Sequence, residues 1–265
     1  MKRSLLAGVA IGALISVSAA NAADLPRKAP VMVPAALPVL SWTGCYVGGN
    51  VGGGWAKNNV TQTAAAPGSS LTPSLSGRAT TGVDTSGAVF GGQVGCDYQF
   101  ANKIVIGIQG MLDGTSITGT EADAFASVLP GAPVGSIGVK TKWLGSVTGR
   151  LGYSFLQQNE ALIYVKGGGA WARYESNLTN LTTNIVFPGS GPGIVDNTFS
   201  GWTVGGGFEY RLAKNWSAFI EYNYYDFGEK TIFTGSGGGL SSNQIDLKPK
   251  LQTVTVGINY RFWTP

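Results

Sequence analysis

The chain has 265 residues, with 41 glycines, 18 Lys and Arg, 14 Asp and Glu, two cysteines and no histidine. Hydrophobic residues make up 43% of it, so a disordered polar polymer is excluded. The lack of histidine excludes Ser-His-Asp and Cys-His catalysis and histidine-ligated metal or haem. No apolar run reaches the roughly 18 residues that a transmembrane helix needs. We therefore expect a protein that is not an enzyme and that has no cofactor and no metal site.

Residues 1–22 have the features of a secretory signal peptide. A basic start, Met1-Lys2-Arg3, precedes an apolar stretch from Leu5 to Val17. Ala20-Asn21-Ala22 then supplies the small-x-small pattern that signal peptidase reads. We predict cleavage between Ala22 and Ala23; the alternative, a short membrane anchor, fits poorly because the apolar stretch is too short. Loss of two basic residues lowers the net charge from +4 to +2, which indicates no nucleic-acid partner.

Residues 23–40 are rich in proline. Four prolines recur at intervals of four residues, at Pro26, Pro30, Pro34 and Pro38. Proline donates no backbone hydrogen bond and favours extended, solvated chain. We therefore expect a periplasmic spacer here, with partner binding as the alternative, and one folded domain over residues 41–265.

From Trp42 onward, apolar and polar residues alternate with a period of two, which predicts β-strands. These strands cover about residues 42–56, 88–100, 104–115, 141–155, 161–174, 201–212, 216–226 and 251–262. Short connections at 101–103, 156–160 and 213–215 alternate with long ones at about 57–87, 116–140, 175–200 and 227–250. The pattern predicts an all-β, eight-stranded antiparallel up-and-down transmembrane β-barrel with short periplasmic turns and four long extracellular loops.

The seven tryptophans all fall at the ends of predicted strands. Trp55, Trp143, Trp171 and Trp202 would form an outer belt, and Trp42, Trp216 and Trp263 an inner one. Membrane barrels carry aromatic belts at both lipid–water interfaces. The alternative is a secreted soluble barrel of the lipocalin or avidin kind, whose large aromatic residues would more often lie in mid-strand.

The polar positions of the strands would face the lumen of such a barrel. The predicted lumen network consists of Asp97, Gln109, Asp113, Lys142, Arg150, Lys166, Glu209, Arg211, Glu221 and Arg261. Eight strands enclose a space just wide enough for side chains, and buried charges need partners. We expect these residues to close the lumen; the alternative is a narrow passage for small polar solutes.

Cys45 and Cys96 share the phase that would face lipid, near the periplasmic ends of neighbouring strands. The periplasm is oxidising, so a structural disulfide is feasible if the two residues are directly opposed. The alternative is two independent small apolar side chains.

Several segments together resemble the small outer-membrane antigen family of alphaproteobacteria, whose members are labelled outer-membrane immunogenic or porin-family proteins. The resemblance is carried by the residues Ala23-Asp24-Leu25-Pro26-Arg27-Lys28-Ala29-Pro30, Trp42-Thr43-Gly44-Cys45-Tyr46-Val47-Gly48-Gly49-Asn50, Gly201–Tyr210, Glu221–Gly228 and Val256–Phe262. It covers the mature chain except the long loops. Cys45 and Cys96 depart from it, because aromatic residues are usual there, and Trp263-Thr264-Pro265 extends past the usual terminal phenylalanine.

The resemblance implies a barrel similar to the OmpA membrane domain, in the outer membrane of a Gram-negative bacterium. Its partners would be outer-membrane lipid, lipopolysaccharide and the machinery that inserts barrels. Some relatives are described as surface antigens or haemin binders and others only as porin-like. Haemin capture here would require tyrosine, and Tyr174 and Tyr225 are the candidates near the outer rim. The sequence leaves the oligomeric state open.

Overall fold

The computed structural model describes residues 40–64, 77–122, 136–179, 194–237 and 240–262. The predicted signal peptide, nearly all of the predicted spacer and Trp263 lie outside these residues. In the described part of the chain, no helix is long and apolar enough to span a membrane.

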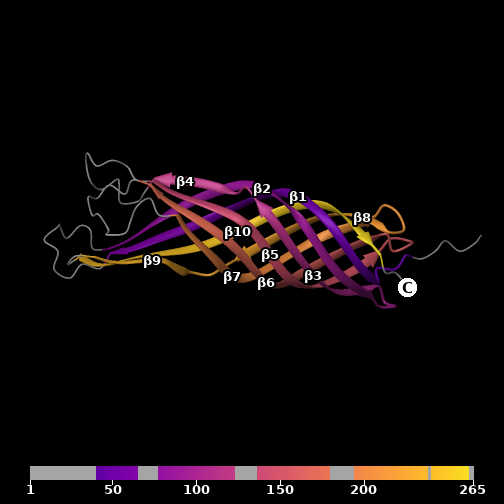
Figure 1. The fold of residues 1–265 in the computed structure, drawn as a ribbon. Coiled ribbons are helices and arrows are strands. Elements are labelled where there is room, and N and C mark those ends of the chain that lie inside the picture. The colour runs from indigo at the N-terminus through magenta and orange to yellow at the C-terminus, as the bar shows by residue number, and fades with distance from the viewer. Residues whose placement is uncertain (1–39, 65–76, 123–135, 180–193, 238–239, 263–265) are drawn as a thin grey trace, which may run out of the picture. The chain divides into compact units, whose positions relative to one another are not determined.

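The described residues form ten β-strands in one antiparallel sheet (Figure 1). They are β1 (Gly44–Ala64), β2 (Gly77–Gln99), β3 (Ile104–Thr115), β4 (Thr118–Ala122), β5 (Ser136–Phe155), β6 (Ala161–Thr179), β7 (Ile194–Arg211), β8 (Trp216–Asp226), β9 (Lys230–Gly237) and β10 (Leu240–Arg261). β3 and β4 both lie between β2 and β5, one beyond the other, and so occupy a single strand position in the sheet. β8 and β9 likewise occupy a single strand position beside β10. Because β1 pairs with both β10 and β2, the sheet closes into a ring of eight positions. The predicted eight-stranded antiparallel barrel is confirmed.

The two ends of the barrel differ. At one end, called the inner end, short turns join β2 to β3, β5 to β6 and β7 to β8, close to the predicted positions. At the outer end the strands run much further than predicted: β1 continues to Ala64, and β2 begins at Gly77. The alternation of apolar and polar residues stops there because strands beyond lipid have no apolar outer face to maintain, although their backbone pairing continues.

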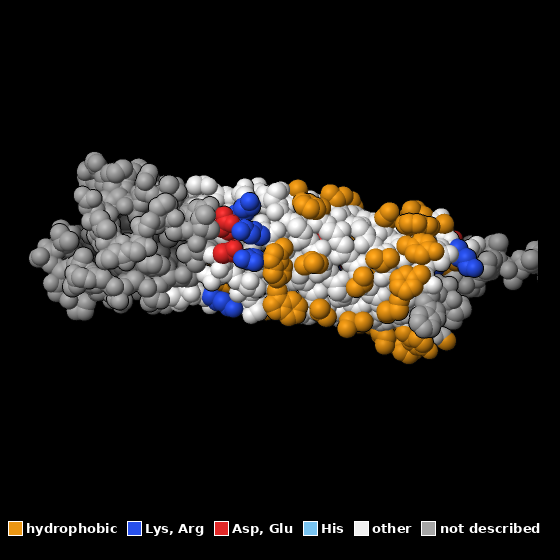
Figure 2. Space-filling view, viewed as in Figure 1, with side chains coloured by type: hydrophobic (Ala, Val, Ile, Leu, Met, Phe, Trp, Pro, Cys, Tyr) orange, Lys and Arg blue, Asp and Glu red, His pale blue; other side chains and the backbone are white. Residues whose placement is uncertain are grey.

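The outer face between these ends is apolar. In β3, Ile106, Ile108 and Leu112 are 44%, 58% and 64% exposed, whereas Gln109 and Asp113 between them are buried. Figure 2 shows hydrophobic side chains spread over this part of the barrel, with charged side chains beyond its outer limit. Such a band would be an aggregation hazard in water and is what lipid contact requires.

Aromatic residues lie at both edges of the apolar band. Trp55, Trp171 and Trp202 are 41–51% exposed toward the outer end, and Trp216 is 46% exposed at the inner end. Trp42 differs from the prediction: it is fully buried inside the barrel. It precedes β1, so the alternation of the strand does not determine where its side chain points.

Cys45 and Cys96 are directly opposed in the β1–β2 pair and form a disulfide in the structure. Both side chains face outward, as their phase predicts. The bond joins the two strands next to their inner ends, one residue inside the start of β1.

Candidate functional site

The lumen brings together most of the predicted polar residues. Nine of the ten face inward and are at most 6% exposed: Asp97, Gln109, Asp113, Arg150, Lys166, Glu209, Arg211, Glu221 and Arg261. They come from β2, β3, β5, β6, β7, β8 and β10. The barrel is thus filled by side chains from almost every strand.

An ion-pair network lies in the inner half of the lumen. Arg150 Nη2 lies 2.5 Å from Glu209 Oε2, and Arg150 Nη1 lies 3.6 Å from Asp97 Oδ2. Arg261 Nη2 donates to the same Asp97 oxygen at 2.9 Å. The Arg150 guanidinium also lies 3.7 Å from the centroid of the Tyr164 ring. Each charge has an opposite charge beside it, which offsets the cost of its burial.

A second ion pair continues the network toward the outer end. Lys166 Nζ lies 2.6 Å from Glu221 Oε1, and both side chains are fully buried. Tyr164 donates its hydroxyl hydrogen to Glu221 Oε2 at 2.9 Å, and Asn223 Nδ2 donates to Oε1 at 2.9 Å. The Glu221 carboxylate therefore has three partners from β6 and β8.

A chain of amides links the two ion pairs. Gln109 Nε2 donates to Gln93 Oε1 at 2.7 Å, and Gln93 Nε2 donates to Asn259 Oδ1 at 2.8 Å. Asn259 Nδ2 then donates to Glu209 Oε1 at 2.9 Å, while Lys166 Nζ donates to Gln109 Oε1 at 3.3 Å. Gln93 and Asn259 are absent from the predicted lumen network, although their inward phase in the sequence marks them.

Trp42 lies across the inner mouth of the barrel. Its indole nitrogen donates to the carbonyl oxygen of Asn159 at 2.8 Å, and its backbone nitrogen donates to Gln99 Oε1 at 2.7 Å. The guanidinium groups of Arg211 and Arg261 lie 4.7 and 5.4 Å from its ring centroid. Arg261 also donates to the Trp42 carbonyl oxygen at 2.6 Å. The segment before β1 is therefore tied to several strands around the mouth.

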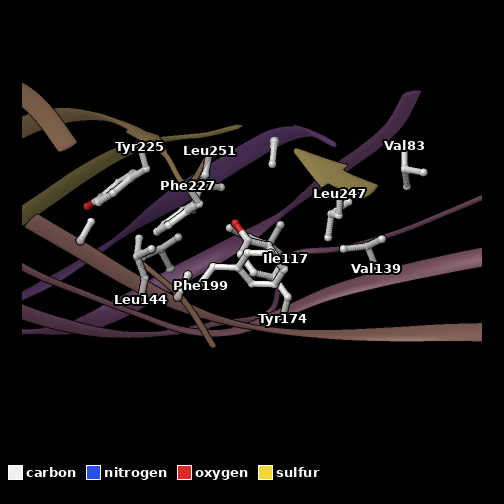
Figure 3. Close-up of a cluster of buried hydrophobic side chains, with 14 of the residues drawn as sticks. Val83, Ile117, Val139, Leu144, Tyr174, Phe199, Tyr225, Phe227, Leu247 and Leu251 are labelled. Carbon is white, nitrogen blue, oxygen red and sulfur yellow. The ribbon is translucent and has the colours of Figure 1, made fainter. Parts of the chain in front are cut away.

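A buried apolar cluster, absent from the sequence-based prediction, lies in the outer half of the lumen. Figure 3 shows aromatic and aliphatic side chains that meet inside the barrel. The buried cluster consists of Ala56, Val83, Val89, Met111, Ile117, Val139, Leu144, Ala170, Ala172, Tyr174, Phe199, Tyr225, Phe227, Leu247 and Leu251. Six of these fifteen residues, Val83, Ile117, Val139, Phe199, Phe227 and Leu247, lie in segments predicted to be loops, so their inward phase could not be read.

Tyr174 and Tyr225 were expected to be available near the outer rim, and this was wrong. They are 1% and 0% exposed, inside the apolar cluster. The Tyr174 ring packs edge-on against Phe199 and Phe227, with centroids 5.2 and 5.9 Å apart. Their burial follows from the inward phase of β6 and β8, which continues past the tryptophan belt.

Lys142 was expected to face the lumen, and this was also wrong. Its side chain is 38% exposed and lies 2.6 Å from Glu175 and 3.4 Å from Asp196 on the outer face. The β5–β6 register shifts between Thr141 and Trp143, which leaves Lys142 as the extra residue of a β-bulge. A bulge re-aims the side chain at its position. Arg173 donates to Asp196 beside it, and this contact holds the pKa of Asp196 below its usual range.

Comparison with known proteins agrees with this geometry. The family model described as outer membrane protein beta-barrel domain matches residues 9–262. The chain belongs to this outer-membrane β-barrel family. Its members lie in the outer membrane of Gram-negative bacteria, which accounts for the apolar band and both aromatic edges.

Relatives of this β-barrel family member include immunogenic proteins of Brucella. The 31 kDa outer-membrane immunogenic protein of Brucella melitensis biotype 1 is 34% identical over 99% of this chain and 100% of its own length. The 25 kDa outer-membrane immunogenic protein of Brucella abortus biovar 1 is 28% identical over 94% of each chain. Among solved structures, OprG from Pseudomonas aeruginosa is similar with a TM-score of 0.46 at 11% identity, covering 86% of this chain and 100% of that one.

Proposed function

We propose that this barrel is a structural and surface-display component of the outer membrane and that its lumen does not conduct. The observation that carries the proposal is the filling of the lumen at every level. Trp42 lies across the inner mouth, the paired charges of Arg150 and Glu209 follow, and the apolar cluster around Tyr174 and Phe199 occupies the outer half. A hydrated ion would have to break buried ion pairs and then cross an apolar section.

The homologues support the display part of the proposal. Two relatives are named as outer-membrane immunogenic proteins, and one matches along its whole length. A surface-displayed protein needs a rigid base in the membrane, and the paired charges and closed sheet supply one. Catalysis forms no part of the proposal.

Planar-bilayer conductance tests it. The mature protein is refolded, and its folding is verified by the faster gel mobility of the unheated barrel. Membranes containing folded barrel should show no discrete current steps, and neither should Asp84→Asn, an exposed substitution on β2. Steps whose size changes in Glu221→Gln would contradict the proposal and establish the second candidate, a low-conductance pore for small polar solutes. The charged inner half of the lumen is the feature that favours this candidate.

We further propose that outer-leaflet lipopolysaccharide contacts the cations just beyond the outer tryptophans. Lys142 and Arg173 are 38% and 47% exposed there. Reduced co-purification of lipopolysaccharide with Arg173→Ala, compared with Lys103→Ala at the inner end, tests this contact.

The insertion machinery is the second partner in the proposal. It would read the exposed stripe of Val256, Ile258 and Tyr260 on the last strand.

A further inference from the structure

A layer of small and polar side chains separates the ion-pair network from the apolar cluster. Asn50 Nδ2 donates to Asp113 Oδ1 at 3.0 Å and so joins β1 to β3 across β2. Thr253 pairs with Asn223 between β10 and β8, and Thr255 follows Thr253 on the same inward face. Ser146 faces inward on β5, diagonal to Asp113 in the β3–β5 pair. The tilt of barrel strands brings these register positions to one level of the lumen.

Six buried oxygen atoms of this layer have no hydrogen-bond partner among the described residues. They are Asn50 Oδ1, Asp113 Oδ2, Ser146 Oγ, Asn223 Oδ1, Thr253 Oγ1 and Thr255 Oγ1. Their residues are at most 8% exposed, and Asp113 is 1% exposed. Each unsatisfied buried polar atom destabilises the fold, so six at one level indicate partners other than protein.

Glycines on neighbouring strands leave room for two of these side chains. A Cβ atom at Gly91 would lie 2.2 Å from Asp113 Oδ1, and one at Gly205 would lie 2.3 Å from Asn223 Oδ1. Both glycines lie on the lumen-facing phase of their strands, as Gly95 and Gly207 also do. The missing side chains of Gly91 and Gly205 therefore provide the space that the Asp113 carboxylate and the Asn223 amide occupy in the lumen.

The charges of the lumen leave Asp113 without an ion pair. Among the described residues, Asp97, Glu209 and Glu221 each have a cation within 4.0 Å, whereas no such cation lies beside Asp113. The remaining lumen cation, Arg211, donates to the backbone of Ser41 and Lys214 at the inner mouth. The charge of Lys166 acts on Asp113 from a distance, but Lys166 is paired with Glu221. A buried carboxylate without an ion pair of its own is disfavoured.

We propose that this layer binds a monovalent alkali cation, with Asp113 Oδ2 as its charged ligand and the free oxygens of Asn50, Asn223 and Thr255 as neutral ligands. Oxygen atoms are the ligands of hard cations, and Ca²⁺ sites usually combine several carboxylates. One carboxylate with neutral oxygens matches a single positive charge, as in the oxygen-lined Na⁺ and K⁺ sites of transporters and channels. The proposal goes beyond the proposed function and holds whether or not the barrel conducts.

The test is to refold the full mature chain in NaCl, KCl, RbCl or choline chloride at equal ionic strength. The thermal transition is followed by gel mobility, and crystals grown with Rb⁺ are searched for an anomalous peak in the lumen. We expect a higher transition temperature in at least one alkali chloride than in choline chloride, rising with its concentration. We also expect a Rb⁺ peak beside Asp113.

Two variants and a control make the result specific. Asp113→Asn should remove both the cation dependence and the peak, and the exposed Asp84→Asn should keep both. Thr255→Val retains the carboxylate but removes one neutral ligand, so it should need a higher Rb⁺ concentration for the same stabilisation; it also serves if Asp113→Asn fails to fold. Equal transitions in alkali and choline chloride without a peak, or a cation effect that survives in Asp113→Asn, would overturn the proposal in favour of bound water alone. Neither result depends on bilayer conductance.

Discussion

The Lys166–Glu221 pair shows at the residue scale how the lumen carries its charges. Both side chains are fully buried, and the Glu221 carboxylate also accepts from Tyr164 and Asn223. Removal of one partner from a buried pair leaves a charge without solvent or counter-ion. The two residues are therefore more strongly coupled to each other than surface ion pairs are.

We expect Lys166→Met to lower the free energy of unfolding by about 3–5 kcal/mol, because it strands the Glu221 carboxylate. The double variant Lys166→Met/Glu221→Gln should recover most of this loss, since it removes both charges and keeps an acceptor for Tyr164. Urea unfolding in lipid vesicles, followed by tryptophan fluorescence, measures both. Additive losses in the double variant would show that the two residues do not interact.

Trp42 is the second residue whose contacts predict a measurable effect. Trp42→Ala should destabilise the barrel by about 3–5 kcal/mol, as expected for a fully buried tryptophan, since the variant loses packing, a hydrogen bond and two cation–π contacts. Trp216→Ala is the matched control, because Trp216 is half-exposed at the same end of the barrel. The same unfolding assay compares the two variants, and equal losses would place Trp42 outside the lumen.

At the scale of elements, the β1–β2 pair combines many glycines with a covalent link. β1 contains Gly48, Gly49, Gly52, Gly53 and Gly54, and β2 contains Gly87, Gly91, Gly92 and Gly95. Glycine-rich strands specify their register weakly, and a slip of one residue would exchange the lumen and lipid faces. The Cys45–Cys96 disulfide joins directly opposed residues and so excludes such a slip.

We expect Cys45→Ser/Cys96→Ser to lower the free energy of unfolding by about 2–4 kcal/mol, the usual range for loss of a disulfide. Reductant should lower the stability of the native protein by a similar amount and leave the double variant unchanged. Urea unfolding with and without reductant gives both values. A native protein that is indifferent to reductant, with free thiols detected by alkylation and mass measurement, would rule out the bridge.

At the scale of the whole molecule, the apolar band sets the position of the barrel in the membrane. Its centre carries strongly exposed aliphatic residues such as Val165, at 59% exposure, between the outer and inner aromatic edges. An arginine at the bilayer midplane costs about 2–4 kcal/mol, and one near the interface costs about 0–1 kcal/mol. The loss of stability caused by an outward-facing arginine therefore reports how deep its position lies in the bilayer.

Val165→Arg should accordingly destabilise the barrel by about 2–4 kcal/mol, and Leu212→Arg by about 0–1 kcal/mol. Leu212 is 63% exposed and follows β7 at the inner end, so the two positions differ in depth and hardly in exposure. Unfolding in vesicles of one lipid composition compares them. A larger loss of stability in Leu212→Arg than in Val165→Arg would contradict this placement and put the bilayer midplane nearer the inner end.

The sequence predicts the membrane part of the fold well because lipid imposes a strict period of two. Strand order, the inner turns and nine inward polar residues all follow from that period. The prediction from this period fails at positions where lipid contact does not determine the direction of the side chain. The bulge turns Lys142 outward, and the segment before β1 places Trp42 inside the barrel. Phe199 is also buried in the lumen, because β7 extends beyond the lipid into a segment predicted to be a loop. Packing and backbone pairing decide these positions, and neither leaves a periodic signal.

The bulge at Lys142 divides β5 into two segments of opposite parity. On the membrane side of it, even-numbered residues such as Leu144 face the lumen; on the outer side, odd-numbered residues such as Thr141 and Val139 do. Loss of Lys142 would therefore join the two segments in regular alternation, with Thr141 still paired with Tyr174 and Trp143 still paired with Arg173. A difference of one residue in chain length at this point can thus be accommodated without moving the part of the barrel that lipid holds.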